Sequence, residues 1–179
     1  MLLDLPEPPI SPENLFACLD GLGIAYRTVN HPPLFTVEQS QALRGTIPGG
    51  HVKNLFLKDK KGILFLVVAE EDAVIDLKSL HRRLGATGRF SFASADQMRE
   101  ILGVEPGSAT PFAVANDRAR RVTLVLDAGL MEHAVINCHP LVNTMTTAIG
   151  RDDLLRFLDA MEHPPRIVAV TGSETAGAA

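Results

Sequence analysis

Cysteine is scarce in this chain of 179 residues, which has only Cys18 and Cys138, far apart in the sequence. A disulfide framework needs several cysteine pairs, and a zinc site needs cysteine or histidine ligands at short, regular spacings. Neither the cysteines nor the histidines show such a spacing. We therefore expect both thiols to be reduced, and we expect no metal and no other cofactor.

The sequence also lacks a long apolar run, and no stretch is long enough to cross a bilayer. The first residues, Met1 to Pro6, lack the basic start and the long apolar core of a secretory signal peptide. These absences predict a protein that has no membrane partner and that is located in the cytoplasm.

The chain also has no excess of positive charge, since its formal net charge is -4 at pH 7. Proteins that coat nucleic acid without regard to its sequence depend on many Lys and Arg contacts to phosphate. Local basic clusters remain at Lys58, Lys60 and Lys61, at Lys78, Arg82, Arg83 and Arg89, and at Arg118, Arg120 and Arg121. Such clusters are most often solvated surface, but together they could bind a short stretch of phosphate backbone.

Several well-known motifs are missing too, namely a dinucleotide-binding glycine motif, a Walker-type loop and the nucleophile elbow of α/β-hydrolases. The composition, 46% hydrophobic and 21% charged, is that of one ordinary globular domain. Strands and helices do not alternate regularly, which favours an α+β domain built on a mixed sheet. We divide the chain into an N-terminal extension (1–10), the domain (11–165) and a C-terminal tail (166–179), disordered at its end.

Capping residues and apolar spacing predict the secondary structure. We expect helices over residues 11–23, 36–45, 76–85, 94–103 and 152–161, and strands over residues 24–29, 52–58, 63–69, 122–127 and 134–138. The helix 36–45 is short, polar and flanked by prolines, so it should be among the more mobile elements. The segment Glu105 to Pro111 contains two prolines and a glycine, and it should form a rigid loop with exposed N–H groups.

The stretch from Gly49 to Lys58 combines strand character with two polar residues, Lys53 and Asn54. Neighbouring residues of a strand point to opposite faces, so the two side chains cannot both be simple solvent-facing groups. Lys53 could extend into water at a strand edge, as most lysines do. Alternatively, it could hold an anion or a polarised carbonyl at the mouth of a pocket.

Polar residues also gather at Gly107 to Pro111 and at His139 to Thr146. The adjacent Cys138 and His139 are a weak candidate for a nucleophile pair, because they point to opposite faces of a strand. Cys138 is more often a small buried apolar residue. His139 could be a general base or a structural hydrogen-bonding group.

Together these motifs resemble a known family. Lys53-Asn54 after Gly49-Gly50-His51, the Gly107-x-x-x-Pro111 loop and the run from His139 to Thr147 are similar to the YbaK/ProX family of aminoacyl-tRNA deacylases, relatives of the editing domain of bacterial prolyl-tRNA synthetase. The segment His31 to Glu38 and the run Thr146 to Ile149 resemble the ProX branch, also called PrdX or ProXp-ala. The resemblance covers roughly residues 10–165.

The resemblance implies a single domain with a curved, barrel-like sheet flanked by helices, and an enzyme that removes alanine from mischarged tRNA(Pro). It implies that Lys53 is essential, that the backbone near Gly107 lies close to the scissile ester, and that neither a protein nucleophile nor a metal is used. The substrate would contact residues of all three motifs: Asn54, Ser108, Ala109, Thr110, Pro111, His139, Asn143 and Thr146. The implied partners are the acceptor end of tRNA(Pro) and prolyl-tRNA synthetase.

The residues fit that chemistry. An aminoacyl ester is already activated, so a site that orients it and stabilises the developing oxyanion can suffice without a catalytic triad. A synthetase pocket sized for proline rejects alanine weakly, since missing methylenes are worth only about 1–3 kcal/mol, whereas a second, tighter site excludes proline sterically. Candidate walls of that tighter site are Leu34, Phe35 and Val37.

The basic helix with Lys78, Arg82 and Arg83 could meet the acceptor stem of the tRNA. Two other functions stay open. The chain could remove cysteine from Cys-tRNA(Pro), or it could be a non-catalytic module that binds tRNA or an amino acid as an accessory or regulator. The number of subunits is not predicted.

Overall fold

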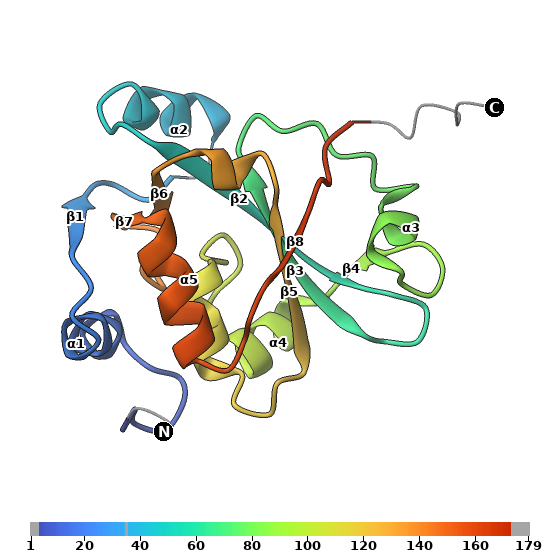
Figure 1. Ribbon diagram of the computed structural model, residues 1–179, viewed down its shortest axis with the longest axis horizontal. Coiled ribbons are helices and arrows are strands. Elements are labelled where there is room, and N and C mark those ends of the chain that lie inside the picture. The colour runs from blue at the N-terminus through green and yellow to red at the C-terminus, as the bar shows by residue number, and fades with distance from the viewer. Residues whose placement is uncertain (1–3, 35, 173–179) are drawn as a thin grey trace.

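The computed structural model describes residues 4–34 and 36–172, and for residues 37, 40 and 44 it describes only the backbone. Figure 1 shows the arrangement of the elements. The helices are α1 (Pro12–Gly21), α2 (Val37–Arg44), α3 (Leu80–Leu84), α4 (Ala95–Gln97), the π-helix η1 (Met98–Leu102), the 3-10 helices η2 (Pro111–Asn116) and η3 (Leu130–Glu132), and α5 (Arg151–Ala160). The strands are β1 (Tyr26–Asn30), β2 (Gly50–Lys58), β3 (Leu64–Glu70), β4 (Ser91–Phe92), β5 (Val122–Asp127), β6 (Val135–Cys138), β7 (Met145–Gly150) and β8 (Arg166–Val168).

The strands form one mixed sheet in the order β1-β7-β6-β2-β3-β5-β8, and β4 pairs with β2 beside this path. The long hairpin β2–β3 is antiparallel, whereas β3–β5 and β5–β8 are parallel. β2 joins β6 in parallel through only two residue pairs, Gly50 with Ile136 and His51 with Asn137. This short junction connects the small subsheet β1-β7-β6 to the rest of the sheet. The expected α+β domain with a mixed sheet is therefore confirmed.

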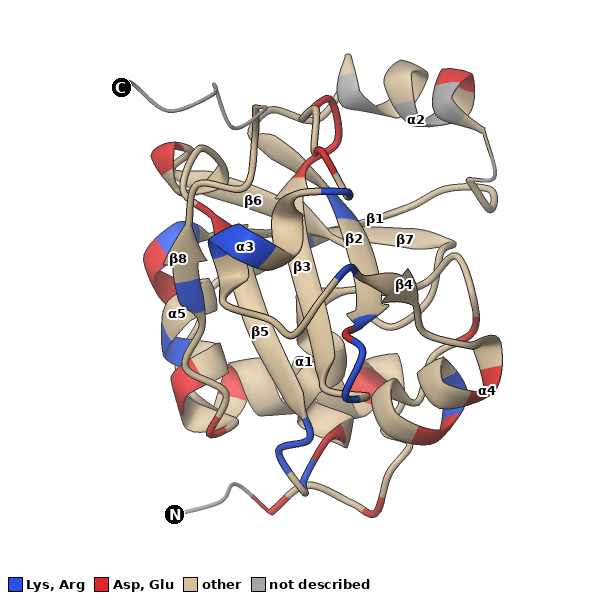
Figure 2. Ribbon diagram, turned by 90° about the vertical axis from the view of Figure 1, so that its right-hand side faces the viewer, with Lys and Arg blue, Asp and Glu red and all other residues tan. Residues whose placement is uncertain are grey.

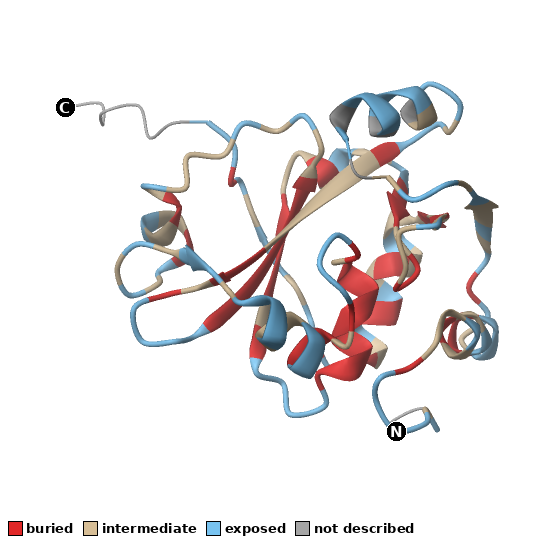
Figure 3. Ribbon diagram, turned by 180° about the vertical axis from the view of Figure 1, so that it is seen from behind, coloured by how far each residue is buried: buried red, intermediate tan, exposed pale blue. Residues whose placement is uncertain are grey.

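Each face of the sheet packs on its own apolar cluster. The larger cluster includes Phe56 of β2, Phe112 of η2 and Phe157 of α5, and the last two rings meet edge to face with centroids 5.4 Å apart. The smaller cluster, on the other face, includes Leu57 of β2 with Leu80 and Leu84 of α3. Burial follows this plan in Figure 3, where red segments concentrate on the central strands and on α5, while α2 is largely exposed. Successive residues of β2 thus face different cores.

The predicted helix starts are borne out where a side-chain cap defines them. Ser11, Thr36 and Ser94 each accept a hydrogen bond from the backbone three residues later and form capping boxes. The third helix begins at Leu80 rather than at Asp76, because the Asp76 carboxylate accepts hydrogen bonds from Lys78 N and Ser79 Oγ and holds a turn there.

Five elements are absent from the sequence prediction: the 3-10 helices η2 and η3 and the strands β4, β7 and β8. The strand β7 covers Met145–Gly150, where polar residues suggested only the end of a strand. Its polar side chains are satisfied by partners distant in the sequence: Thr147 Oγ1 lies 2.8 Å from Thr28 Oγ1, and Thr146 is paired with His31. The residues of this segment alone do not predict hydrogen bonds to partners more than 100 positions away in the sequence.

The segment after α5 runs back along the sheet as β8 and then reaches the loop before α3. Arg83 donates hydrogen bonds to the carbonyls of Ala169 and Gly172, and Arg166 donates to that of Leu84. Residues 166–172 are therefore attached to the domain, beyond its predicted limit at residue 165. Among residues 4–34 and 36–172, no helix is long and apolar enough to span a membrane.

Candidate active site

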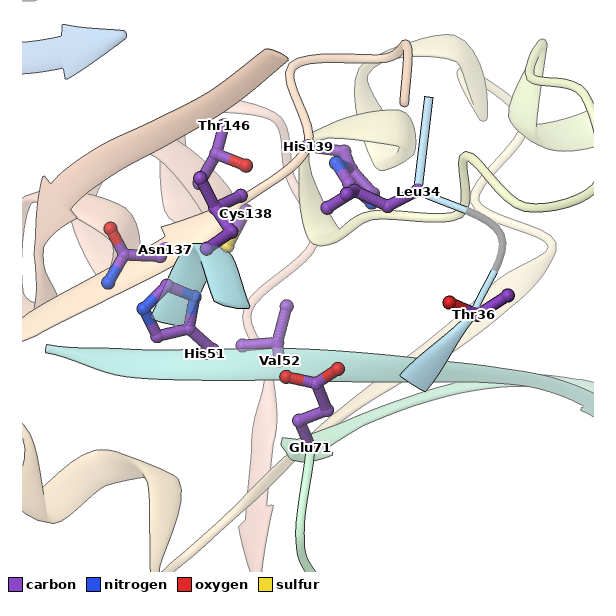
Figure 4. A pocket seen from close by; sticks show the side chains of 10 residues that line it. Leu34, Thr36, His51, Val52, Glu71, Asn137, Cys138, His139 and Thr146 are labelled. Atoms are coloured by element: carbon purple, nitrogen blue, oxygen red, sulfur yellow. The ribbon is translucent and has the colours of Figure 1, made fainter. Parts of the chain in front are cut away.

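A polar cavity of about 250 Å³ lies where the small subsheet meets the start of β2, and Leu43 of α2 is part of its lining. Its lining comes from six parts of the chain: Leu34, Thr36, Leu43, His51, Val52, Glu71, Asn137, Cys138, His139 and Thr146. Figure 4 shows Leu34 next to His139 on one side, His51 and Val52 rising from β2, and Glu71 below that strand. We call this space the polar cavity.

Two histidines in this region each have one ring nitrogen engaged by a backbone carbonyl. His139 Nδ1 lies 3.1 Å from the carbonyl of Met145, so this nitrogen donates, and in the neutral ring Nε2 keeps a free lone pair. His31 Nδ1 lies 2.8 Å from the carbonyl of Pro32 and donates in the same way. Neutral His31 then accepts at Nε2 from the Thr146 hydroxyl, 2.8 Å away. Backbone carbonyls thus fix both tautomers.

Burial lowers the pKa of His139 below its ordinary value, and the neighbouring His31, whose ring centroid is 6.4 Å away, lowers it further. The hydrogen bond to Met145 and the charge of Glu71 act in the opposite direction but are smaller than the effect of burial. His139 is therefore neutral near pH 7, and its free nitrogen can accept a proton or a hydrogen bond.

Cys138 lines the same cavity, but its side chain is only 1% exposed, and burial strongly raises the pKa of its thiol. A thiol that stays protonated is a poor nucleophile. The interpretation of Cys138 as a small buried apolar residue agrees with this geometry. Among the described residues, no group of three or more His, Cys, Asp or Glu side chains is arranged to hold a metal ion.

The glycine pair at the start of β2 is required by close packing against β6 and the segment before it. Gly49 has a φ of +113°, and a Cβ there would lie 2.8 Å from both Asn137 Nδ2 and the carbonyl of Val135. A Cβ on Gly50 would lie 2.9 Å from the ring of His133. The chain can enter β2 against β6 only because both positions lack a side chain.

Lys53 does not line the polar cavity. It alternates along β2 with Leu55 and Leu57, which pack on the smaller cluster, and its ammonium donates a hydrogen bond to the carbonyl of Ala73. The bend at Gly107 leads instead into η2, which packs on the larger cluster. Among the described residues, no hydrogen bond or ion pair joins Lys53 to this bend, and the catalytic role of Lys53 stays a prediction. The side chain is partly buried, so it is not on the open exterior.

Asn54 faces the larger cluster, opposite Val68 of β3. Its Oδ1 is shielded from solvent and has no hydrogen-bond partner among the described residues. A buried amide oxygen without a partner is unfavourable by about 1–3 kcal/mol, so it marks a place where a donor from a ligand or water would be stabilised.

The predicted rigid bend is present, and Gly107 adopts a φ of +91° that favours glycine. Ser108 N donates to the carbonyl of Glu105, whereas the N–H groups of Gly107 and Ala109 have no acceptor among the described residues. Thr110 and Pro111 are buried at the start of η2. Only part of the bend therefore has donors to offer to a ligand.

Ser108 and Asn143 line a separate cavity of about 460 Å³ beside the bend. Asn143 Nδ2 lies 3.9 Å from the position that a Cβ on Gly107 would occupy. The loop from His139 to Thr144 lies between this cavity and the polar cavity. The structure thus gathers Leu34, His139 and Thr146 in one space, and Ser108 and Asn143 in another.

The remaining predicted residues have mixed outcomes. Phe35 and the side chain of Val37 lie outside the described residues, so only Leu34 of the three predicted walls is placed. On α3 and before it, Lys78 is exposed, whereas Arg83 binds the C-terminal segment. Arg82 is exposed and has a partner of its own. Figure 2 shows Lys and Arg residues spread over α3, β2, β8 and several loops.

The sequence interpretation assigned no role in the site to His31, His51 or Asn137. His51 Nε2 lies 2.8 Å from the carbonyl of Ile47, and Asn137 donates to the carbonyls of Pro48 and Gly50. Both side chains hold the segment between α2 and β2 in place. A histidine before two prolines, as at His31, is the one local signal that could have pointed to a site residue.

Comparison with known proteins finds one matching family model and several similar proteins. Residues 31–157 match the family model described as the aminoacyl-tRNA editing domain. The chain is 41% identical over 153 residues to the prolyl-tRNA synthetase associated domain-containing protein 1 of Danio rerio, covering 84% of this chain and 83% of that protein. It is 37% identical over 147 residues to the prolyl-tRNA editing protein ProX of Acetoanaerobium sticklandii, covering 82% and 89%.

The fold also matches solved structures. A structure described as a candidate trans-editing enzyme for prolyl tRNA synthetase superposes with a TM-score of 0.68 at 20% identity, covering 92% of this chain and 99% of that one. The structure of the hypothetical protein APE2540 gives a TM-score of 0.66 at 21% identity, covering 86% and 97%. At these identities the matches show a common fold.

Proposed function

Because the chain belongs to the family of aminoacyl-tRNA editing domains, we propose that it hydrolyses the ester of mischarged tRNA(Pro), specifically Ala-tRNA(Pro). It is a hydrolase, and its relatives include a protein named for prolyl-tRNA editing. A cytoplasmic location and an association with prolyl-tRNA synthetase, the enzyme named in several relatives, belong to the same proposal.

The observation that supports this function best is the state of His139. Its Nδ1 is engaged by a backbone carbonyl, its pKa is lowered mainly by burial, and its Nε2 is free in a small polar cavity. Such a nitrogen can accept a proton from a water molecule that attacks the ester carbonyl. The free hydroxyl of the terminal ribose could assist in orienting that water.

The predicted roles of the other motifs complete the mechanism. The N–H groups of Gly107 and Ala109 would stabilise the developing oxyanion, and the unpartnered Oδ1 of Asn54 would accept a hydrogen bond from the substrate. Lys53 would bind a phosphate of the terminal nucleotide or the substrate carbonyl. For this, its ammonium must leave the carbonyl of Ala73 and the bend must approach β2 when the substrate binds.

Selectivity for alanine would come from the apolar side of the polar cavity, which has a volume of about 250 Å³. Leu34, Leu43 and Val52 form this side. The methyl group of alanine would lie against these side chains, and the bulkier pyrrolidine ring of proline would be excluded by them. This is the tighter site of a double sieve.

The test is the release of amino acid from a panel of charged tRNA(Pro), carrying alanine, cysteine or proline, by the wild-type protein and by Lys53→Ala. We expect rapid release of alanine, little release of proline, and loss of activity in Lys53→Ala at an unchanged melting temperature. Release of cysteine without alanine would replace the proposed substrate. Tight binding of uncharged tRNA without cleavage of any ester would instead identify a non-catalytic binding module.

A further inference from the structure

A second cavity, of about 370 Å³, opens on the same face of the small subsheet as the polar cavity. It is lined by Arg27, Val29, Thr46, Ile47, Pro48, Gly49, His133, Ala134, Val135, Thr146 and Ala148. None of the roles proposed above uses this space. We call it the apolar cavity, because Val29, Ile47, Val135 and Ala148 form most of its walls.

The two cavities are direct neighbours. Thr146 lines both of them, and it is only 5% exposed. Asn137, which lines the polar cavity, donates from Nδ2 to the carbonyl of Pro48 at 3.1 Å and to that of Gly50 at 3.3 Å. These bonds hold the segment that forms one wall of the apolar cavity. Thr146 is therefore a common wall of the two cavities, and a ligand that passes over its side chain would reach both.

Charge at the rim of the apolar cavity comes from Arg27. It lies on β1 opposite Ala148 of β7, its side chain is exposed, and among the described residues it has no hydrogen bond or ion pair. The other titratable group of the lining, His133, is already paired with Glu70. An unpaired guanidinium beside apolar walls suits a ligand that has a flat apolar part and an anionic group.

A terminal nucleotide of RNA has this combination, and it also has the required shape. Its ribose carries the aminoacyl ester at one corner and the base at another, so the two groups diverge from a single small ring. A base has two apolar faces, and stacking or burial of one base is worth about 1–3 kcal/mol in proteins that bind single strands. Its 5′ phosphate is the anion.

Resting on the function proposed above, we propose that the apolar cavity binds the base of the 3′-terminal nucleotide while the aminoacyl group occupies the polar cavity. The ribose lies next to Thr146, between the two spaces. Arg27 binds the adjoining phosphate, so that of the two partners proposed for Lys53 only the substrate carbonyl remains. The protein thus recognises the end of the RNA chain itself, independently of the amino acid attached to it.

The experiment measures the binding of two uncharged minihelices by fluorescence anisotropy. Both copy the acceptor stem of tRNA(Pro); one ends in CCA, and the other lacks the terminal adenosine. Each is titrated with the wild type, with Ala148→Leu, which fills the apolar cavity, and with Arg27→Ala. Matched controls are Ala95→Leu on exposed α4 and Arg156→Ala on α5, since both side chains are exposed and lie outside both cavities and outside the basic clusters. Thermal melting verifies that every variant is folded.

For the wild type, removal of the terminal nucleotide should weaken binding about tenfold, corresponding to the lower end of the value for one base. In Ala148→Leu the two minihelices should bind equally, because the cavity is closed to the base. Arg27→Ala should weaken binding of both minihelices several-fold, and the controls should behave as the wild type. A terminal nucleotide that matters equally in wild type and Ala148→Leu would overturn the proposal.

Failure of this inference can be told apart from failure of the proposed function, because no ester is cleaved in the binding measurement. If the wild type deacylates Ala-tRNA(Pro) but Ala148→Leu keeps its discrimination between the minihelices, only the inference is refuted. If binding depends on the terminal nucleotide as expected but no charged tRNA is hydrolysed, the base site is supported and the editing activity is refuted.

Discussion

The polar and the apolar cavity lie side by side on one face of the small subsheet, yet they differ in the groups that line them. The polar cavity contains His139 with a free ring nitrogen and the carboxylate of Glu71. The apolar cavity has valine, isoleucine and alanine walls and a charged residue at its rim. Groups that can transfer protons are thus concentrated in the polar cavity, whereas the apolar cavity offers mainly an apolar surface.

This difference indicates a division of labour. Proton transfer needs a group whose tautomer and position are fixed, and backbone carbonyls provide this for His31 and His139. Recognition of a base needs a flat apolar surface, which β1, β6 and β7 provide through alternate residues. One strand, β7, contributes Thr146 to both spaces, so the division occurs within a single element.

The largest effect on this arrangement is expected from Gly49→Ala. The new Cβ would lie 2.8 Å from Asn137 Nδ2 and from the carbonyl of Val135, at a φ of +113°. The substitution should reduce the free energy of unfolding by about 3 kcal/mol and disturb both cavities. Gly62→Ala is the matched control, since it has a φ of +80° but open space around it, and it should cost about 1 kcal/mol. Urea denaturation of both variants measures this difference; equal losses would show that packing around Gly49 is unimportant.

A change confined to the polar cavity is His139→Ala. If Nε2 accepts the proton of the attacking water, kcat for Ala-tRNA(Pro) should fall about a hundredfold, whereas binding of an uncharged minihelix should be unchanged. Rapid single-turnover assays and anisotropy measure the two quantities. A kcat within twofold of the wild type would remove His139 from the mechanism.

The pH dependence follows from the direction of the pKa shift of His139. Its pKa in the folded protein lies below its ordinary value of about 6.5, so the neutral form, which can accept a proton, predominates at and above that pH. The contribution of this residue to stability is present above about pH 6.5 and is lost as the pH falls through the lowered pKa. We expect kcat to be flat between pH 7 and pH 8 and to fall only on the acid side of about pH 6.5. A loss of activity centred above about pH 7 would contradict this assignment.

The boundary between the cavities is tested by Thr146→Val, which keeps the shape but removes the hydroxyl that meets His31. We expect kcat/KM to fall about tenfold, since one hydrogen bond next to the reacting groups is lost. Thr147→Val is the matched control, because its hydroxyl pairs with Thr28 and is not part of either cavity lining. Similar losses in both variants would mean that the effect comes from the stability of β7 and not from the site.

The smallest effect on activity is expected from Cys138→Ala. The thiol is buried and burial raises its pKa, so it supplies neither a nucleophile nor an accessible charge. Deacylation should stay within about twofold of the wild type, while stability decreases by about 1 kcal/mol through lost packing. Mass spectrometry after treatment of the native protein with iodoacetamide should find Cys138 unmodified. Rapid alkylation of Cys138 together with loss of activity would restore the nucleophile hypothesis.

The accuracy of the sequence predictions differs between parts of the molecule. The hairpin β2–β3 and the capped helix α1 were predicted because their signals are local: turn residues between apolar runs, and a capping box. The strand β7 was missed because its polar residues are typical of a loop. In the structure their hydroxyl groups form hydrogen bonds with Thr28 and His31, which are distant in the sequence. The resemblance to a known family identified the motif residues. It did not predict that His139 and Thr146 line one cavity, that Ser108 and Asn143 line another, and that Lys53 lies on the opposite face of the sheet.

The sequence by itself determined where most helices begin, which residues are apolar enough to form a core, and which motifs place the chain in its family. Those signals act between residues a few positions apart, through hydrogen bonds and periodicity that any local segment possesses. Only the tertiary structure decided that His31 meets Thr146, 115 positions away, and that Lys53 faces a different core from the bend at Gly107. The reason is that the pairing of β1 with β7 and of β2 with β6 is selected by the packing of the whole sheet.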